Sequence, residues 1–379
     1  MLGGFALLCL GHAAAPAATA ALDAFYAPAC RLLSTWLAAI FAPAFVTLPL
    51  TMPSLAAAQL ALFVGLCAAG LASSTATNAL LYALFRRVGG SGRAPAEPPP
   101  AAAARSRSSP FPRSERACLA AAALASAAAH FLCGTPLALD VALLSSSLLA
   151  FSVASTFPPR FNLVVHPFLT TSAVTMGLCA GLALVTSQSW HAVLSRYRSG
   201  AGAWLLSLMG PTVISFAFQL FAYRKQLAAN AVQIVGVGVG GAMCGMMTAA
   251  AAARALGLPH VLRVALLSRS TTTALAGDVA RLSSIEPGLG MLAAFATGLF
   301  GIWFGKPLLR LLRIEDPAAR GLSLSAAAHG GALLTLIDEP EAFPYAALML
   351  NLGGACTVGL LSVRPIRAFL LSVALGMPA

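Results

Sequence analysis

Long apolar runs, separated by short polar or Gly/Pro-rich stretches, dominate the hydrophobicity pattern of this chain. The runs are about 20 residues long, the length at which an α-helix crosses the hydrocarbon core of a bilayer. A transmembrane β-barrel would instead show alternating apolar and polar residues. The pattern therefore predicts an all-α polytopic membrane protein of about 10–12 membrane segments, some of them interrupted or re-entrant. The predicted segments are 1–14, 36–50, 55–85, 117–133, 136–157, 162–187, 202–223, 227–256, 261–281, 288–312, 319–337 and 343–370.

Composition supports this class. Of the 379 residues, 59% are hydrophobic and only 9% are charged, with a mean hydropathy of +0.85, whereas soluble domains carry about 25% charged residues. The net charge of +12 does not indicate a nucleic-acid surface, because seven of the 23 Lys and Arg residues lie in one stretch, 86–116. In a membrane protein such basic stretches report orientation.

That stretch also suggests the domain organisation. Residues 86–116 are rich in Pro, Ser and Arg, and we interpret them as a linker on the cytoplasmic or stromal side, with a regulatory or lipid-binding role as the alternative. The linker divides a membrane half at 1–85 from a longer membrane half at 117–379. The chain begins directly in an apolar run without a basic leader, so targeting is either internal or carried by residues that precede this sequence.

A weak internal repeat is visible in the longer half. Arg263-Val-Ala-Leu-Leu-Ser268 is echoed 57 residues later by Arg320-Gly-Leu-Ser-Leu-Ser325, and each copy follows a loop proline. Many secondary transporters are built from repeats whose interrupted helices form the substrate site. The echo predicts such a construction here.

The stretch LLSRSTTTALAGD (266–278) places a charge and several hydroxyls within an apolar region. An arginine at the centre of a membrane helix costs about 2.5–3.5 kcal/mol on insertion scales, so it normally meets a cavity or a partner. A guanidinium beside the freed N–H groups of a broken helix suits a carboxylate. We therefore predict that Arg269, Ser270, Thr272 and Thr273 bind a substrate carboxylate. The alternatives are an arginine that extends from a helix end to water and one that pairs with Asp278.

Two further islands break apolar runs. His329 precedes Gly330 in SLSAAAHGGALL. It either binds substrate or takes up a proton near neutral pH, and the alternative is a histidine that hydrogen-bonds to backbone in a packed bundle. Gly210 and Pro211 interrupt another run and predict a helix break, with an ordinary proline kink as the alternative. Substrate-site predictions thus include His329, and helix-break predictions include Gly210, Pro211 and Gly330.

Other motifs exclude more than they suggest. The eight cysteines are scattered without metal-ligand spacing, so we predict no metal site and no cofactor. Residues 236–241 match GxGxxG, but they lie within an apolar helical run and not between a strand and a helix, so they predict close helix packing. No catalytic constellation is present, and an enzyme is the least favoured class.

The three islands together resemble the LrgB/CidB family of membrane proteins. That family has a Leu-Gly-Pro-Ala-Thr-Val patch, here 209–213, a Lys-Ser-Val-Thr-Thr patch, here 269–273, and an Arg-Gly-Leu followed by a Ser-His-Gly patch, here 320–322 and 328–330. The resemblance runs from about 200 to 370. Residues 36–50 resemble, more weakly, the partner family LrgA/CidA. The sequence departs from the family pattern at Ser268 and Ala274, where the family has prolines.

Fusion of the two parts through a basic linker is the arrangement of the plastid glycolate/glycerate carriers of plants and algae. The resemblance implies a secondary transporter that exchanges glycolate and glycerate across the chloroplast inner envelope in photorespiration, with the lipid bilayer as its environment and with possible proton or sodium coupling and homo-oligomerisation left open. It also implies residues before Met1, including a transit peptide. The alternative is a holin-like protein of a bacterial-type plasma membrane that modulates murein hydrolases.

Overall fold

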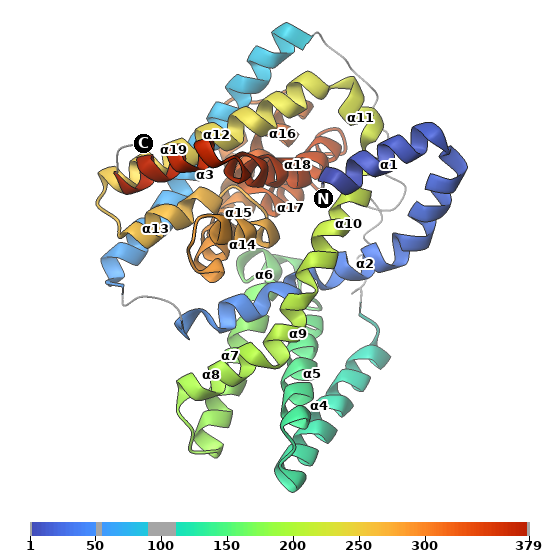
Figure 1. Ribbon diagram of the computed structural model, residues 1–379, viewed down its shortest axis with the longest axis vertical. Helices are drawn as coiled ribbons and strands as arrows, with labels where there is room; N and C mark the ends of the chain where they lie inside the picture. Colours follow the sequence, from blue (N-terminus) through green and yellow to red (C-terminus); the bar gives the residue numbers. More distant parts are fainter. Residues whose placement is uncertain (1, 51–54, 90–110, 377–379) are drawn as a thin grey trace. The chain divides into compact units, whose positions relative to one another are not determined.

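The computed structural model describes residues 2–50, 55–89 and 111–376, and its regular secondary structure in these ranges is helical throughout (Figure 1). Within them, nine segments are long and apolar enough to cross a membrane. The predicted all-α polytopic class is therefore confirmed. The nine segments are Pro16–Leu50, Ala57–Gly89, Arg113–Cys133, Pro136–Ala154, Pro167–Val185, Trp190–Ala222, Ala231–Ala255, Pro287–Leu311 and Phe343–Ser362.

The individual helices subdivide some of these segments. In chain order they are α1 (Leu2–Ala14), α2 (Pro16–Val46), η1 (Leu48–Leu50), α3 (Ala57–Gly89), α4 (Arg113–Cys133), α5 (Pro136–Ala154), α6 (Pro159–Val164), α7 (Pro167–Val185), α8 (Trp190–Ser199), α9 (Ala201–Ser207), α10 (Met209–Ala222), α11 (Arg224–Ala229), α12 (Ala231–Ala255), α13 (His260–Ala265), η2 (Leu266–Ser268), α14 (Thr273–Leu282), α15 (Pro287–Leu311), α16 (Pro317–Ala328), α17 (Gly330–Thr335), α18 (Phe343–Ser362) and α19 (Arg364–Leu375).

The predicted interrupted helices are present. Segment 261–281 forms α13, η2 and α14 with a turn between the last two, and segment 319–337 forms α16 and α17 with a break at His329. Because each is divided into short helices, neither contributes a continuous span. Predicted segment 1–14 likewise forms only α1, whose 13 residues are too few for a span. These three segments account for the difference between the twelve listed from hydrophobicity and the nine long helices of the described residues.

The chain forms two compact units, which we describe separately. The first comprises the described residues of Met1–Ala24, Pro53–Ala103 and Val213–Ala379, and the second those of Phe25–Met52 and Ala104–Thr212. The division at 86–116 inferred from the sequence remains a prediction about the origin of the halves. One detail of it is corrected: residues 86–89 continue α3 and 113–116 begin α4, while 90–110 lie outside the described residues.

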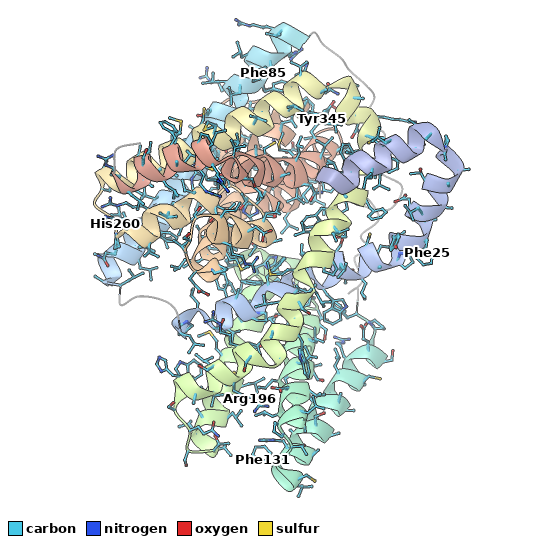
Figure 2. The ribbon with its side chains drawn as sticks, viewed as in Figure 1. Phe25, Phe85, Phe131, Arg196, His260 and Tyr345 are labelled. Carbon is cyan, nitrogen blue, oxygen red and sulfur yellow. The ribbon has the colours of Figure 1, made fainter. Side chains whose placement is uncertain are left out.

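The second unit contains a helical hairpin made by α4 and α5. Gly134 ends α4 in the left-handed region (φ 66°), where a residue without Cβ is favoured, and Pro136 begins α5. Arg196 of α8, labelled in Figure 2, joins α5 through an ion pair of 3.0 Å between Nη2 and Oδ2 of Asp140. The same guanidinium group donates to the carbonyl of Pro136 at 2.8 Å. These bonds fix α8 against the start of α5.

The first unit is organised around α3, α12, α15, α16 and α18. Helix α3 packs against α12, α15 and α16, and α18 packs against α12, α14 and α16. The main apolar core lies among these helices and includes Leu71, Ile234, Leu309, Leu324 and Leu348, each buried. The interrupted segments, which include α14 and α16, pack against the continuous helices α3, α12, α15 and α18 through these buried faces.

Glycines on α12 permit the close approach of α3. A Cβ at Gly240 would lie 3.1 Å from Cδ1 of Leu81, and one at Gly236 would overlap the ring of Phe85, labelled in Figure 2. Gly238 faces the other way, with Sγ of Cys356 on α18 at 3.1 Å from such a Cβ. Small residues let helix backbones come close in a membrane. The predicted packing role of the 236–241 glycines is borne out by these contacts.

Candidate functional site

The first break lies between η2 and α14. Residues 269–272 form a turn, and Thr272 caps α14 with an extended backbone (φ −63°, ψ 148°) and an Oγ1 that accepts from the N–H of Leu275 at 3.4 Å. Immediately before the turn, the hydroxyl of Ser268 donates to the carbonyl of Gly290 on α15 at 3.0 Å. The turn is therefore anchored to a continuous helix on one side and capped on the other.

Arg269 stands in this turn with its side chain 1% exposed. Its Nη2 donates to Oγ of Ser74 on α3 at 2.8 Å and to the carbonyl of Gly245 on α12 at 3.3 Å. Its Nε and Nη1 are buried and have no hydrogen-bond partner among the described residues. A guanidinium has five N–H donors, so three of the five meet no acceptor. A buried ionic group left this incompletely paired costs several kcal/mol.

Neither alternative explanation for Arg269 fits the geometry. Extension to water is excluded by the burial of the side chain. Asp278 instead pairs with Arg281, one turn along α14, with Nη1 and Oδ1 at 2.7 Å. Within the described part of the chain, no carboxylate forms an ion pair with Arg269. Among these residues, only neutral groups bond to its guanidinium.

The predicted hydroxyl contacts divide into two kinds. Ser270 shares a neighbour with the guanidinium, because a Cβ at Gly245 would be 3.5 Å from its Oγ and 3.8 Å from Nη2 of Arg269. Thr272 is occupied as the cap of α14, and Thr273 is the first, partly buried residue of that helix. The structure thus brings Ser270 to Arg269 and assigns Thr272 a structural bond. Substrate contacts by any of the three remain predictions.

The second break centres on His329, which ends α16 and precedes α17. Its backbone is in the positive-φ region (φ 39°, ψ −116°), where a residue with a side chain is strained. The imidazole is buried and its Nε2 lies 2.8 Å from the carbonyl oxygen of Ala294 on α15. Because a carbonyl only accepts, Nε2 is the donor. A Cβ at Gly298 would lie 2.8 Å from Cε1, so that glycine makes room for the ring.

The two breaks occupy equivalent positions of a structural repeat. Arg263 donates from Nε to the carbonyl of Leu258 at 2.5 Å, and Arg320 donates from Nη1 to the carbonyl of Ile314 at 2.8 Å. Each bond fastens a short helix to the loop that precedes it. These are the two arginines that the sequence echo relates, 57 residues apart.

The repeated serines are equivalent as well. Ser268 donates to the carbonyl of Gly290, and Ser325 donates to that of Ala346 at 2.7 Å. Each acceptor is the fourth residue of the long helix that follows its break, α15 or α18. The same offset of 57 relates Thr272 to His329, and both residues stand at the N-cap position of the helix that follows.

Helix α15 brings the two breaks together. Its Gly290 carbonyl accepts from Ser268, next to Arg269, and its Ala294 carbonyl accepts from His329. These carbonyls are four residues apart, one turn or about 6 Å along the helix. The predicted residues Arg269 and His329 therefore belong to neighbouring breaks on one face of α15, although no direct contact between them is observed.

The residues predicted to break helices lie in two different units of the chain. Gly330 is the first residue of α17 and directly follows the second break. Gly210 and Pro211 lie in the first turn of α10, just after the interruption at Leu208 that separates α9 from α10. Residues Trp190–Ala222 nevertheless form one long apolar segment, so the helix-break role of Gly210 and Pro211 remains a prediction. Both residues belong to the second unit, whereas the arrangement around Arg269 is built within the first.

Sequence reasoning missed the contribution of α3. Ser74 bonds to Arg269 across 195 residues of chain, and Gly70 lies directly beneath the guanidinium. Cys67, one turn earlier, approaches the carbonyl of Ala293 with its Sγ at 3.7 Å. A polar stripe of Ser74, Thr75 and Asn78 within an apolar helix was the available signal.

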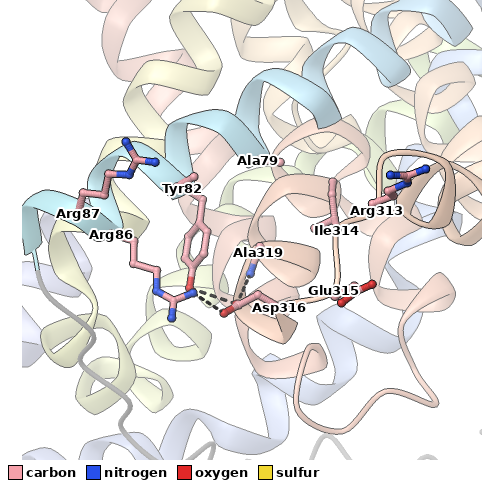
Figure 3. A pocket seen from close by; sticks show the side chains of 10 residues that line it. Ala79, Tyr82, Arg86, Arg87, Arg313, Ile314, Glu315, Asp316 and Ala319 are labelled. Atoms are coloured by element: carbon pink, nitrogen blue, oxygen red, sulfur yellow. Dashed lines mark hydrogen bonds and ion pairs between the residues drawn. The ribbon is translucent and has the colours of Figure 1, made fainter.

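A cavity of about 630 Å³ lies at the far end of α3, against the loop between α15 and α16 (Figure 3). Asp316 at its wall accepts from Tyr82 at 3.2 Å and pairs with Arg86 at 2.9 Å. Arg87 and Arg313 also line it. Tyr82 is 12 residues beyond Gly70, about 18 Å along the helix, so this cavity is separate from the surroundings of Arg269.

Residues 147–365, more than half of the chain, match the LrgB-like family. The chain belongs to the LrgB-like family. The predicted resemblance to LrgB and CidB is thereby confirmed, and the match includes both breaks but not α3. Whether residues 1–85 derive from an LrgA-type protein stays a prediction.

Several relatives of this LrgB-like protein are informative. It is 29% identical to plastidal glycolate/glycerate translocator 1, chloroplastic, of Arabidopsis thaliana, over 97% of this chain and 73% of the relative. It is 30% identical to the holin-like protein CidB of Staphylococcus aureus, over 34% of this chain and 56% of the relative. It is 26% identical to the antiholin-like protein LrgB of Bacillus mycoides, over 54% and 95% respectively. No solved structure matches the chain significantly.

Proposed function

We propose that this LrgB-like membrane protein is a secondary carrier of small hydroxycarboxylates, which exchanges glycolate and glycerate across the plastid inner envelope. The observation that carries the proposal is Arg269, a buried cation with unpaired donors and no carboxylate partner in the described chain. Charge-assisted hydrogen bonds to a carboxylate would complete its coordination. The similarity to a glycolate/glycerate translocator along nearly the whole chain supports the same substrate class.

The surroundings of Arg269 suggest how such a carrier would work. The guanidinium is enclosed, so a carboxylate reaches Nε or Nη1 only after α3 and the 269–272 turn separate. A bidentate contact uses Nη2 together with a neighbouring nitrogen, and it would replace the longer bond of Nη2 to Gly245, at 3.3 Å. Ser270, whose Oγ approaches Gly245 as Nη2 does, would bond a second substrate oxygen. Opening from either side of the membrane in turn would give alternating access.

Exchange in proteoliposomes tests this function. Vesicles loaded with glycerate and containing the purified protein should take up labelled glycolate with saturation, and the uptake should disappear when internal glycerate is omitted. Arg269→Ala should abolish it, whereas Arg281→Ala, which removes an exposed arginine, should not. Imposed proton or sodium gradients identify coupling in the same assay.

The similarity to holin-like CidB supports a second candidate, a pore or a modulator of lysis. Such an assembly would pass glycolate without saturation and without need for internal glycerate. Unsaturable flux that is indifferent to Arg269 would contradict the carrier and favour this candidate.

A further inference from the structure

One face of α3 carries a line of residues directed at the interrupted helices. Cys67, Leu71, Ser74, Asn78 and Tyr82 are buried and recur every three or four residues, so they share a face of the helix. Leu71 and Tyr82 belong to the main apolar core, whereas Ser74 and Asn78 are polar, Cys67 is weakly polar and Tyr82 carries a hydroxyl. A helix that only filled space between apolar helices would need no such groups. The polar stripe indicates that α3 serves the site.

Gly70 adjoins this face at the position of the guanidinium. A Cβ there would lie 2.6 Å from Cζ, 2.7 Å from Nε and 2.8 Å from Nη1 of Arg269. The two nitrogens nearest to Gly70 are those that lack partners. The missing side chain at Gly70 is therefore what lets the guanidinium pack against α3, with its two unpaired nitrogens on that side.

Ser74, one turn further along α3, contacts the other end of the guanidinium. Its Oγ accepts from Nη2 at 2.8 Å, and both side chains are buried. The bond holds the plane of the guanidinium so that Nε and Nη1 face Gly70. Without it, Nη2 keeps only its longer contact to the carbonyl of Gly245.

The rest of α3 is fastened so that this alignment is maintained. Nδ2 of Asn78 donates to the carbonyl of Ser323 on α16 at 3.2 Å. At the end of the helix, Tyr82 and Arg86 both bond to Asp316, as Figure 3 shows. These contacts fix the rotation of α3 about its axis and its position along that axis relative to both breaks.

On the basis of the carrier function above, we propose that α3 forms one wall of the carboxylate site. Gly70 and Ser74 are positioning residues: the missing side chain of Gly70 lets the guanidinium lie against α3, and the hydroxyl of Ser74 orients it. Because α3 lies outside residues 147–365, the segment that matches the LrgB-like family does not form a complete site by itself. The N-terminal part of the chain is then a component of the binding site.

Paired substitutions on α3 provide the test, since the helix offers a matched control for each residue. Gly70→Ala places a methyl group against the guanidinium, whereas Gly65→Ala enters open space, with no atom within 4 Å of the new Cβ. Ser74→Ala removes the bond to Arg269, whereas Ser73→Ala removes only an exposed hydroxyl that bonds to its own helix. Each substitution and its control replace the same residue type by alanine, so the change in helix propensity is the same within each pair.

The full-length protein carrying each change should be compared with wild type in the glycolate/glycerate exchange assay, with thermal unfolding in detergent measured in parallel. We expect Gly70→Ala to raise the KM for glycolate at least tenfold. Ser74→Ala should raise it about three- to tenfold with little change in maximal rate. Gly65→Ala and Ser73→Ala should keep the wild-type KM. A structural role alone would lower the unfolding temperature and the amount of active protein but leave KM unchanged.

The outcomes separate this inference from the carrier function itself. If wild type exchanges and Arg269→Ala abolishes exchange, but Gly70→Ala and Ser74→Ala keep the KM of their controls, the role of α3 is refuted and the carrier stands. If wild type shows no saturable exchange, the carrier function fails first, and the assignment of α3 fails with it. Should Gly70→Ala not fold, the KM of Ser74→Ala against that of Ser73→Ala decides.

Discussion

The two breaks in the first unit share a backbone plan and differ in chemistry. At each, an arginine fastens the entering helix to its loop and a serine reaches the fourth residue of the next long helix. The first break then holds a charge with unpaired donors, and the second holds an imidazole bonded to the carbonyl of Ala294. A repeated scaffold can thus keep its structural bonds while the chemistry at its two breaks diverges.

The largest expected effect comes from removing the charge at the first break. Arg269→Met retains a long side chain, and we expect glycolate uptake to fall at least about 100-fold, since hydrogen bonds to a charged group contribute about 1.5–3 kcal/mol each. The unfolding temperature should rise by a few degrees, because a buried and incompletely paired charge disappears. Uptake and thermal unfolding check the two halves of this prediction, with Arg281→Met as control. Retained uptake, or a lower unfolding temperature, would show that Arg269 is structural.

At the second break the sign of the stability effect should reverse. His329→Ala removes the buried imidazole and its hydrogen bond to the carbonyl of Ala294, which costs about 1–3 kcal/mol, and we expect about a tenfold fall in uptake. His329→Gly should recover about 1 kcal/mol of that stability, because glycine adopts positive φ without strain. Unfolding of the three proteins in detergent measures these differences. An uptake loss as deep as that of Arg269→Met, with wild-type stability, would instead make His329 a substrate contact.

The two serines should be alike, in contrast to the residues beside them. Ser268→Ala and Ser325→Ala each remove one buried bond to the next long helix, and each should cost about 1 kcal/mol. The double substitution should be additive within about 0.5 kcal/mol. The free energies of unfolding of the two single variants and the double variant provide the measurement. A difference above about 1 kcal/mol between the single variants would contradict the structural equivalence of the breaks.

The smallest effect concerns the loop after the second break, which ion pairs tie to its neighbours. A hydrogen bond from Lys306 lowers the pKa of Asp338 below its ordinary value. The stabilisation is therefore present above the unfolded pKa of about 3.9 and is lost as pH falls through the lowered folded pKa. The pair is largely exposed, so it is worth at most about 1 kcal/mol. Asp338→Asn should lower the unfolding temperature slightly at pH 6 and leave it unchanged near pH 2.

Local sequence was sufficient for features that depend on neighbouring residues. The apolar runs predicted the helical class, and the repeated Arg-to-Ser motif and the polar islands predicted the interrupted segments. The glycines of 236–241 predicted close helix packing, which Leu81 and Phe85 show in detail. Each of these rests on hydrophobicity or backbone preference, which act over a few residues.

Partners distant in the chain were not predictable in the same way. Hydrophobicity indicates that α3 is a membrane helix, but its rotation and height depend on packing against α12, α15 and α16. Gly70 and Ser74 contact Arg269 only because of that packing. Ser74 and Arg269 are 195 residues apart in the sequence. Each of the two units also combines early and late segments of the chain. No change in composition along the sequence indicates this combination.

By itself, the sequence determined that this is a helical membrane protein with a cation and hydroxyls inside an interrupted apolar segment, because insertion cost and helix breaking are properties of short stretches. Only the tertiary structure decided that Asp278 does not neutralise Arg269, that α15 joins the two breaks one turn apart, and that α3 lies against the guanidinium. Those outcomes depend on which helix faces meet. Side-chain packing decides this, and the pattern along a single helix leaves it open.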